Sequence, residues 1–274
     1  FYIIIATIRT WLRKRLVPLY ILAALLVIPW SGGVDASPIV RFITEDIVPH
    51  PLRVAESFDA ATWASFAAWL KTMIVDQALP GIVSTLVLTQ IALVGAGALT
   101  LLFFPLVSPK FLGRFGRTVG HIFLVVARST PEYILALVFL LLRGPSMLPA
   151  IVALSLHNGA IIGHLIGRHT EFLKIRPDAP GGINLYAYDV LPRMYRQFLA
   201  FLFYRWEVIM RETAILGILG IATLGFYIDN AFADLRFDRA MFLIVITALL
   251  NLGIDALSRR IRRYLRLQTR TEEL

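Results

Sequence analysis

Residues 191–225 read LPRMYRQFLAFLFYRWEVIMRETAILGILGIATLG, and this stretch decides how the rest of the chain is interpreted. It opens with a Leu-Pro pair and continues as a long apolar run, which predicts a helix. Inside the run lie Arg205, Glu207, Arg211 and Glu212. A charge at membrane depth costs about 3 kcal/mol on insertion scales, so four charges there need partners or water. We therefore expect them to face a protein interior or a solute path rather than lipid.

The same stretch ends in closely spaced small residues. Gly217, Gly220 and Gly225 permit either a close approach of two helices or a broken helix end that lines a path. Plain packing is the alternative interpretation. The spacing therefore predicts packing or gate glycines here.

Composition places the chain in a membrane. Of its 274 residues 58% are hydrophobic and only 16% are charged, and the mean hydropathy is +0.72. A soluble domain has about 45–50% apolar and about 25% charged residues. The composition therefore indicates an integral membrane protein and excludes soluble enzymes.

The positive charge has a topological explanation. The net charge is +9, but the basic residues gather at the ends of apolar runs. This placement is typical of contact with anionic lipid headgroups, so no nucleic-acid partner is expected. The chain has no cysteine, and its five histidines have no carboxylate or thiol at ligand spacing in the sequence, so no metal site is predicted.

Six apolar runs approach the length of a membrane span, which is about 20 helical residues for a core of about 30 Å. They are residues 16–30, 81–104, 118–142, 147–167, 197–220 and 240–257. The third is interrupted by RSTPE at 128–132. Most of the 27 Lys and Arg residues fall on one side if both termini are cytoplasmic. The predicted fold is an all-α integral membrane protein with about six transmembrane helices.

This topology divides the chain into three parts. Residues 1–30 form a cytoplasmic N-terminus and the first transmembrane helix, and residues 31–80 form an extracytoplasmic loop. Residues 81–274 form the transmembrane core, which includes a cytoplasmic loop at 168–197. Within the second part, residues 58–75 have apolar side chains at helical spacing, which predicts an interfacial amphipathic helix or a helix packed on the bundle.

The loop between the fourth and fifth runs is long for a helix–helix connection. Residues 173–192 read LKIRPDAPGGINLYAYDVLP, with a Pro- and Gly-rich turn before a short aromatic helix. Such a helix suits a groove on a partner protein, and a turn on the membrane surface is the alternative. The residues expected to make the partner contact are Asp178, Ala179, Gly181, Tyr186, Asp189, Leu191 and Pro192.

Three segments carry motifs that occur together in one family. They are ARSTPEYILALVFLL at 127–141, LSLHNGAIIGHLIGRHTE at 154–171, and residues 188–225, which run from the Leu-Pro pair through YRWE to a Gly-rich helix end. In these segments the chain resembles the permease subunit of type I binding-protein-dependent ABC importers, in the phosphonate/phosphite branch. The resemblance covers most of residues 118–228, and YRWE with its flanking glycines is its most specific part.

The resemblance implies a transport subunit that is not itself an enzyme. Two permease chains, identical or homologous, would frame a path through the bacterial inner membrane. Two ATP-binding cassette subunits would dock on their cytoplasmic loops and hold the ATP and Mg²⁺, and an extracytoplasmic solute-binding protein would deliver the oxyanion. The chain has no G-x-x-x-x-G-K-[ST] loop, which agrees with nucleotide binding by the partner subunits. No cofactor is expected in this chain.

The cytoplasmic loop departs from the family pattern. The family has Glu-Ala-Ala and then a Gly before the Leu-Pro pair. Here the triplet positions hold Leu173, Lys174 and Ile175, the Gly position holds Ala179, and Glu171 lies two positions early. The departure predicts an altered docking contact and leaves a heteromeric permease pair open.

Eight polar side chains are candidates for the translocation path. Guanidinium groups suit phosphonate oxygens. Mutual neutralisation is the alternative, because Arg128 and Glu132, like Glu207 and Arg211, are four residues apart. An interhelical hydrogen bond is the alternative for the His-Asn pair. The candidates are Arg128, Glu132, His157, Asn158, Arg205, Glu207, Arg211 and Glu212.

Other functions remain open on the sequence. The same architecture could import another small solute, such as an amino acid. A membrane-embedded enzyme would use Arg205, Glu207 and Arg211 on a lipid headgroup and would need no ATPase subunit. An ion-coupled carrier would use Glu132, Glu207 and Asp255, and its uptake would follow membrane potential.

Overall fold

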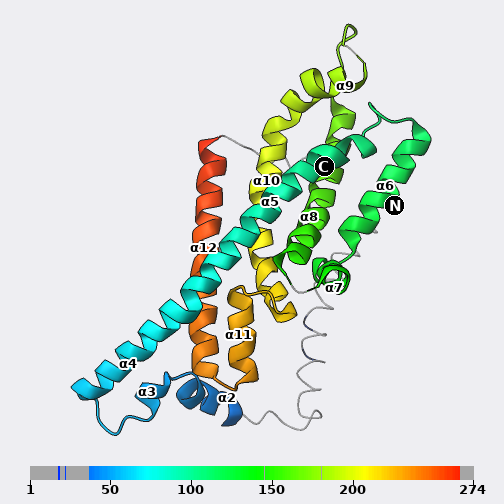
Figure 1. Ribbon diagram of the computed structural model, residues 1–274. Helices are drawn as coiled ribbons and strands as arrows, with labels where there is room; N and C mark the ends of the chain where they lie inside the picture. Colours follow the sequence, from blue (N-terminus) through cyan, green and yellow to red (C-terminus); the bar gives the residue numbers. More distant parts are fainter. Residues whose placement is uncertain (1–17, 19–21, 23–36, 145, 180, 266–274) are drawn as a thin grey trace. The chain divides into compact units, whose positions relative to one another are not determined.

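The computed structural model describes residues 18, 22, 37–144, 146–179 and 181–265 (Figure 1). These residues form helices joined by short connections, with no strand among them. The predicted all-α fold is confirmed. The predicted first span, residues 16–30, lies almost entirely outside the described residues.

The chain separates into two compact units, Phe1–Val48 and Pro49–Leu274. In the first unit the described helices are α2 (Ser37–Arg41) and η2 (Phe42–Asp46). The second unit begins with α3 (His50–Arg53) and contains the remaining helices. All candidate residues discussed below belong to this second unit.

The longest helix of the second unit joins two segments that the sequence separated. α4 (Ala60–Thr72), the π-helical turn η3 (Met73–Ala78) and α5 (Leu79–Val107) form one helix from Ala60 to Val107. The helix expected at 58–75 therefore continues directly into the second predicted span, without a break at residue 80. Pro80 lies in the first turn of α5, where its missing N–H is tolerated. The π-helical turn η3 precedes it, and the helix stays continuous through both.

The third predicted span is sharply bent. α6 (Arg114–Ser129) and α7 (Glu132–Arg143) meet at an angle of 92°. Thr130 is extended because a residue before proline is disfavoured in the helical region, and Pro131 precedes the first turn of α7. The RSTPE interruption thus marks a break in the span, and it places Glu132 at the N-terminus of α7, where the helix dipole favours a carboxylate.

α8 (Met147–His169) is the central helix of the second unit. It packs against α5, α6, α7 and α10, and most of its middle is buried. The 3-10 turn η4 (Thr170–Phe172) continues it toward the loop. Polar side chains in the middle of α8 are therefore held inside the bundle, away from lipid.

The stretch at 191–225 forms a long helix that ends at a bend before a shorter helix. α9 (Gly182–Asn184) and η5 (Leu185–Val190) lead into α10 (Leu191–Leu216), which η6 (Gly217–Leu219) joins to α11 (Leu224–Ala233) at a bend of 43°. A Cβ on Gly217 would overlap the backbone of Gly225 and Phe226, and one on Gly225 would overlap the carbonyl of Ala214. Gly220 has φ +80°, a left-handed conformation that suits glycine.

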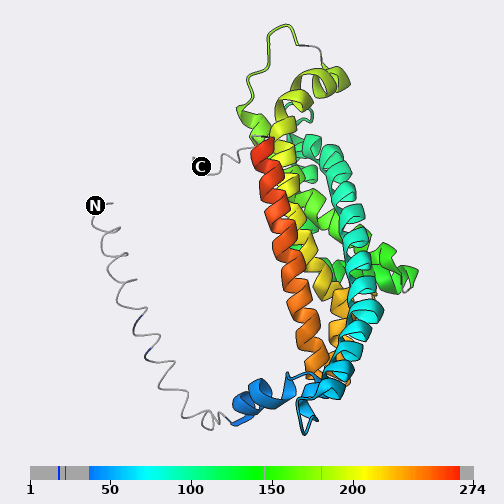
Figure 2. The ribbon, with the colours of Figure 1, turned by 90° about the vertical axis from the view of Figure 1, so that its left-hand side faces the viewer.

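α12 (Phe237–Tyr264) runs alongside α10 and completes the second unit (Figure 2). By length and composition, three described helices can cross a membrane, or up to five if each bent pair counts as one span. With the predicted first run outside the described residues, this count agrees with about six spans.

Candidate functional site

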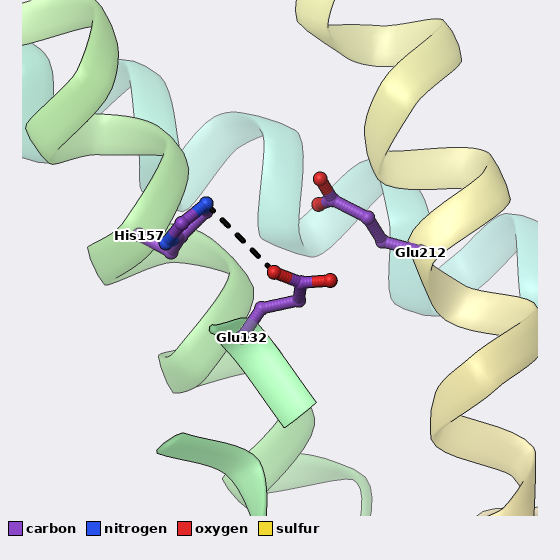
Figure 3. A group of neighbouring side chains, drawn as sticks. All are labelled: Glu132, His157 and Glu212. Atoms are coloured by element: carbon purple, nitrogen blue, oxygen red, sulfur yellow. Dashed lines mark ion pairs between the residues drawn. The ribbon is translucent and has the colours of Figure 1, made fainter. Parts of the chain in front are cut away.

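A cluster of charged side chains lies where α7, α8 and α10 meet. Glu132 comes from the first turn of α7, His157 from the middle of α8 and Glu212 from α10 (Figure 3). Their side chains are 17%, 10% and 13% exposed. One oxygen or nitrogen of each lies within 4.8 Å of the others. Residues distant in sequence thus share one small, largely buried space.

Arg205 joins this cluster through a closed ring of polar contacts. Its Nε donates to Oδ1 of Asn158 at 2.5 Å, and an Nη lies 3.3 Å from Oε1 of Glu212. Asn158 closes the ring by donating from Nδ2 to Oε2 of Glu212 at 3.0 Å. Arg205 and Glu212 are seven residues apart, about two turns, so they lie on the same face of α10. The Arg205 side chain is 15% exposed, and its Nε and one Nη contact Asn158 and Glu212 inside the protein.

The imidazole of His157 has an assignable orientation. Its Nδ1 lies 3.0 Å from the backbone carbonyl of Thr130, in the bend between α6 and α7. A carbonyl only accepts hydrogen bonds, so Nδ1 carries the hydrogen. Nε2 then points toward Oε2 of Glu132 at 3.8 Å, which is too long for a hydrogen bond (Figure 3). The bend in the third span thereby orients a ring on α8.

The remaining candidate charges lie outside the cluster. Glu207 and Arg211 pair with each other at 2.5 Å, and the Arg211 side chain is 59% exposed. The anticipated pair of Arg128 with Glu132 does not form, because the 92° bend between α6 and α7 destroys their i,i+4 relationship. Arg128 is half-buried and has no hydrogen bond or ion pair to any residue in the described part of the chain.

In the loop at 168–197, two of the expected contact residues turn inward. The hydroxyl of Tyr186 donates to the carbonyl of Leu101 at 3.0 Å, and its ring stacks on Phe104 with centroids 5.2 Å apart. Asp189 is buried and lies 3.4 Å from Arg193. These contacts anchor the loop to α5 and α10.

Other loop residues remain at the surface. Asp178, Gly181 and Pro192 are exposed, whereas Ala179 and Leu191 are half-buried. Ile183 and Tyr188 are the large apolar side chains most exposed here, at 81% and 80%. Neither residue was among the expected contact residues, and an isolated isoleucine such as Ile183 gives no signal in the sequence.

The acidic residue that lies two positions early in the loop has a partner of its own. Glu171 is 2.6 Å from an Nη of Arg117 on α6, and both side chains are partly exposed. The pair ties the end of α8 to the start of α6. Glu171 is therefore not a free acidic group at the position of the family's triplet.

The meeting of His157 with two glutamates could not be predicted from spacing along the sequence. Local spacing brings neither carboxylate beside His157, because the three side chains come from three helices and are 25 to 80 positions apart. The polar residues within apolar runs were a signal that each needs a partner, but the partners follow only from how the helices pack.

Comparison with known proteins gives relatives by sequence and by structure. No protein-family model matches. Over 153 residues the chain is 29% identical to the phosphite transport system permease protein PtxC of Stutzerimonas stutzeri, which covers 53% of this chain and 55% of PtxC. It is 24% identical over 155 residues to the phosphate-import permease protein PhnE of Mycolicibacterium smegmatis, covering 54% of this chain and 29% of PhnE. The aligned region thus spans about half the length of the first relative and less of the second.

The fold agrees with these sequence relatives. A crystal structure of an amino acid ABC transporter with histidines matches 76% of this chain and 99% of its own chain, with a TM-score of 0.56 and 20% identity. At this identity the match concerns the fold alone. The sequence relatives are named as transport permeases and not as enzymes. The resemblance expected from the sequence is therefore confirmed: in fold this chain is similar to ABC importer permease subunits, and in sequence to those of the phosphite and phosphonate branch.

Proposed function

We propose that this chain is the permease subunit of an ATP-driven, binding-protein-dependent importer and forms the path for phosphonate- or phosphite-like oxyanions. The observation that carries the proposal is the similarity to permeases named for phosphite and phosphate transport. The fold supports the same class of subunit without indicating the solute.

The cluster around Arg205 supports a role in the path. Arg205 and Glu212 are largely buried in a helix that is long and apolar enough to take part in a bent span. Buried charges in such helices commonly mark solute pathways. An oxyanion could compete with Glu212 for the guanidinium, since both offer two acceptor oxygens to the same fork of donors.

The exposed part of the cytoplasmic loop is the proposed docking surface for the ATPase subunit. Ile183, Tyr188 and Pro192 form its exposed face, while Tyr186 and Asp189 hold it against the bundle. Exposed apolar side chains on a well-anchored segment suit insertion into a groove of a partner. The partner, and not this chain, would bind ATP and Mg²⁺.

The assembly is proposed by analogy with the same class of importer. It contains two permease chains, identical or homologous, two ATPase subunits and an extracytoplasmic solute-binding protein in the inner membrane. Both termini of this chain lie on the cytoplasmic side, as the distribution of Lys and Arg predicts.

Gentle purification from native membranes followed by intact-complex mass measurement tests this proposal. The expected mass corresponds to two permease chains with two ATPase subunits. ATP hydrolysis by that sample should rise with phosphite or a small phosphonate in the presence of the solute-binding protein. If an amino acid stimulated ATP hydrolysis instead, the importer architecture would be supported and the proposed oxyanion substrate would be contradicted. A chain that purifies without an ATPase, even after mild crosslinking, would support the enzyme or ion-coupled alternatives and contradict the proposal.

A further inference from the structure

We propose that Glu132, His157 and Glu212 bind a divalent transition-metal cation, with zinc as the representative ion. Each residue offers one ligand atom to the space between them, and these atoms lie within 4.8 Å of one another (Figure 3). The sequence predicted no metal site. The inference comes from how three helices bring the side chains together.

The orientation of His157 is the first argument for a cation. Because Nδ1 donates to the carbonyl of Thr130, the neutral ring presents the lone pair of Nε2 toward Oε2 of Glu132. Two acceptor atoms, Nε2 of His157 and Oε2 of Glu132, then face each other across 3.8 Å. His157 as a whole residue is only 8% exposed. Nε2 has no hydrogen-bond donor among the described residues. A positive ion between the two atoms removes this conflict.

The separation favours a metal ion over a shared proton. A charge-assisted hydrogen bond between imidazolium and carboxylate would hold the two atoms about 2.7–2.9 Å apart. Zinc bonds to His nitrogen and to carboxylate oxygen are each about 2.0–2.2 Å, so two ligands of a tetrahedral ion lie about 3.4 Å apart. The observed 3.8 Å is closer to the second arrangement than to the first. Small rotations of the glutamate side chains would bring the third ligand into range.

The surroundings of the three ligands resemble those of metal sites. The carbonyl of Thr130 fixes the ring of His157, as carbonyl groups commonly do for metal-bound histidines. Asn158 and Arg205 contact the carboxylate of Glu212 and restrict its position. One imidazole and two carboxylates are a ligand set that suits Zn²⁺ and the neighbouring divalent metals.

The charge of the cluster is the second argument. Two carboxylates, one guanidinium and one neutral imidazole leave a net charge of −1 in a largely buried space. An uncompensated buried charge is costly. A divalent cation would change the net charge to +1 and would offer open coordination positions beside Arg205. If the proposed function holds, the loaded site would attract an oxyanion that the empty site would repel.

Zinc binding to the purified full-length chain tests the site. The protein is prepared without a polyhistidine tag, with whatever subunits accompany it, stripped with a chelator and dialysed against zinc chloride. Bound zinc is then measured by mass spectrometry. Glu132→Gln removes one ligand, and Glu207→Gln is the matched control because Glu207 is a glutamate on α10 paired with Arg211 outside the cluster.

Wild-type protein and Glu207→Gln should bind the same number of zinc ions with the same Kd. Glu132→Gln should bind one fewer, or bind that ion at least about tenfold more weakly. Equal zinc binding by wild type and Glu132→Gln would overturn the proposal. So would a folded wild-type protein that takes up no zinc.

X-ray absorption at the zinc edge of the wild-type protein covers the case in which Glu132→Gln does not fold. An imidazole and oxygen ligands are expected around the ion, and a spectrum without an imidazole would contradict the site. Neither measurement needs substrate or nucleotide. A chain that binds no zinc but purifies with an ATPase would reject only the metal site, and a zinc-binding chain without an ATPase would reject only the importer.

Discussion

The guanidinium of Arg205 lies 3.3 Å from the carboxylate of Glu212, two turns later on α10, and Asn158 of α8 contacts both. The side chain of Arg205 is 15% exposed and that of Glu212 is 13% exposed. Through Asn158 the pair connects α10 to the central helix α8, near the N-terminus of α7. The pair is therefore both a structural contact between helices and the strongest candidate for contact with an anion.

Arg205→Gln should destabilise the protein by about 3 kcal/mol, because it leaves Glu212 as an uncompensated buried charge. Thermal unfolding in detergent measures the loss. The control is Arg211→Gln, whose exposed pair with Glu207 should contribute at most about 0.5 kcal/mol.

The double replacement Arg205→Met with Glu212→Met separates the structural role from the transport role. Because both charges are removed together, folding should largely recover. Uptake should not recover if Arg205 contacts the solute. Recovery of uptake along with stability would show that the pair is only an interhelical tie.

Gly225→Ala should strongly destabilise the turn between α10 and α11, because the added Cβ would overlap the carbonyl of Ala214. Backbone would have to move, so we expect a loss of at least about 2 kcal/mol by overpacking. Gly253→Ala in α12 is the control, since its Cβ would meet nothing within 4 Å and alanine favours the helix by up to about 1 kcal/mol. Similar thermal unfolding of the two variants would contradict the close approach at Gly225.

Replacing Ile183 and Tyr188 together by serine should abolish co-purification of the ATPase subunit and leave membrane insertion intact. Both side chains are exposed and neither anchors the loop, in contrast to the buried Asp189. Tyr264→Ser is the control, because Tyr264 is an equally exposed tyrosine at the end of α12. Retention of the ATPase at wild-type stoichiometry by the double variant would place the docking surface elsewhere.

The start of the long helix should depend on pH. Asp59 accepts a hydrogen bond from the backbone N–H of Thr62 at 2.9 Å, and this bond lowers the pKa of the Asp59 carboxyl. A lowered pKa means that the cap stabilises the helix above the carboxyl's ordinary pKa and is lost as pH falls through the folded value. Amide protection of Thr62, measured by hydrogen exchange, should fall as the pH drops below about 4, the ordinary pKa of an aspartate. Asp59→Asn, which still caps without a charge, should not show that fall.

The sequence predicted the helical membrane class, the interruption at 128–132 and the need of the buried charges for partners. It predicted these because apolar length, proline and charge are local properties. The pairing of Glu207 with Arg211 also followed from spacing. The pair of Arg128 with Glu132, expected from the same spacing, does not form because α6 and α7 meet at a sharp bend. The meeting of Glu132, His157 and Glu212 could not be predicted, since it depends on the packing of three helices. The inward turn of Tyr186 likewise depends on Phe104 and Leu101 of a distant helix.

The most direct test of the proposed function is solute uptake by the native complex reconstituted into liposomes with its solute-binding protein. We predict that radiolabelled phosphite enters only when ATP is present on the cytoplasmic side, and that uptake does not change with membrane potential. Arg205→Met with Glu212→Met should abolish this uptake in a complex that still contains its ATPase. Uptake without ATP, or ATP-driven uptake of an amino acid with none of phosphite, would contradict the account.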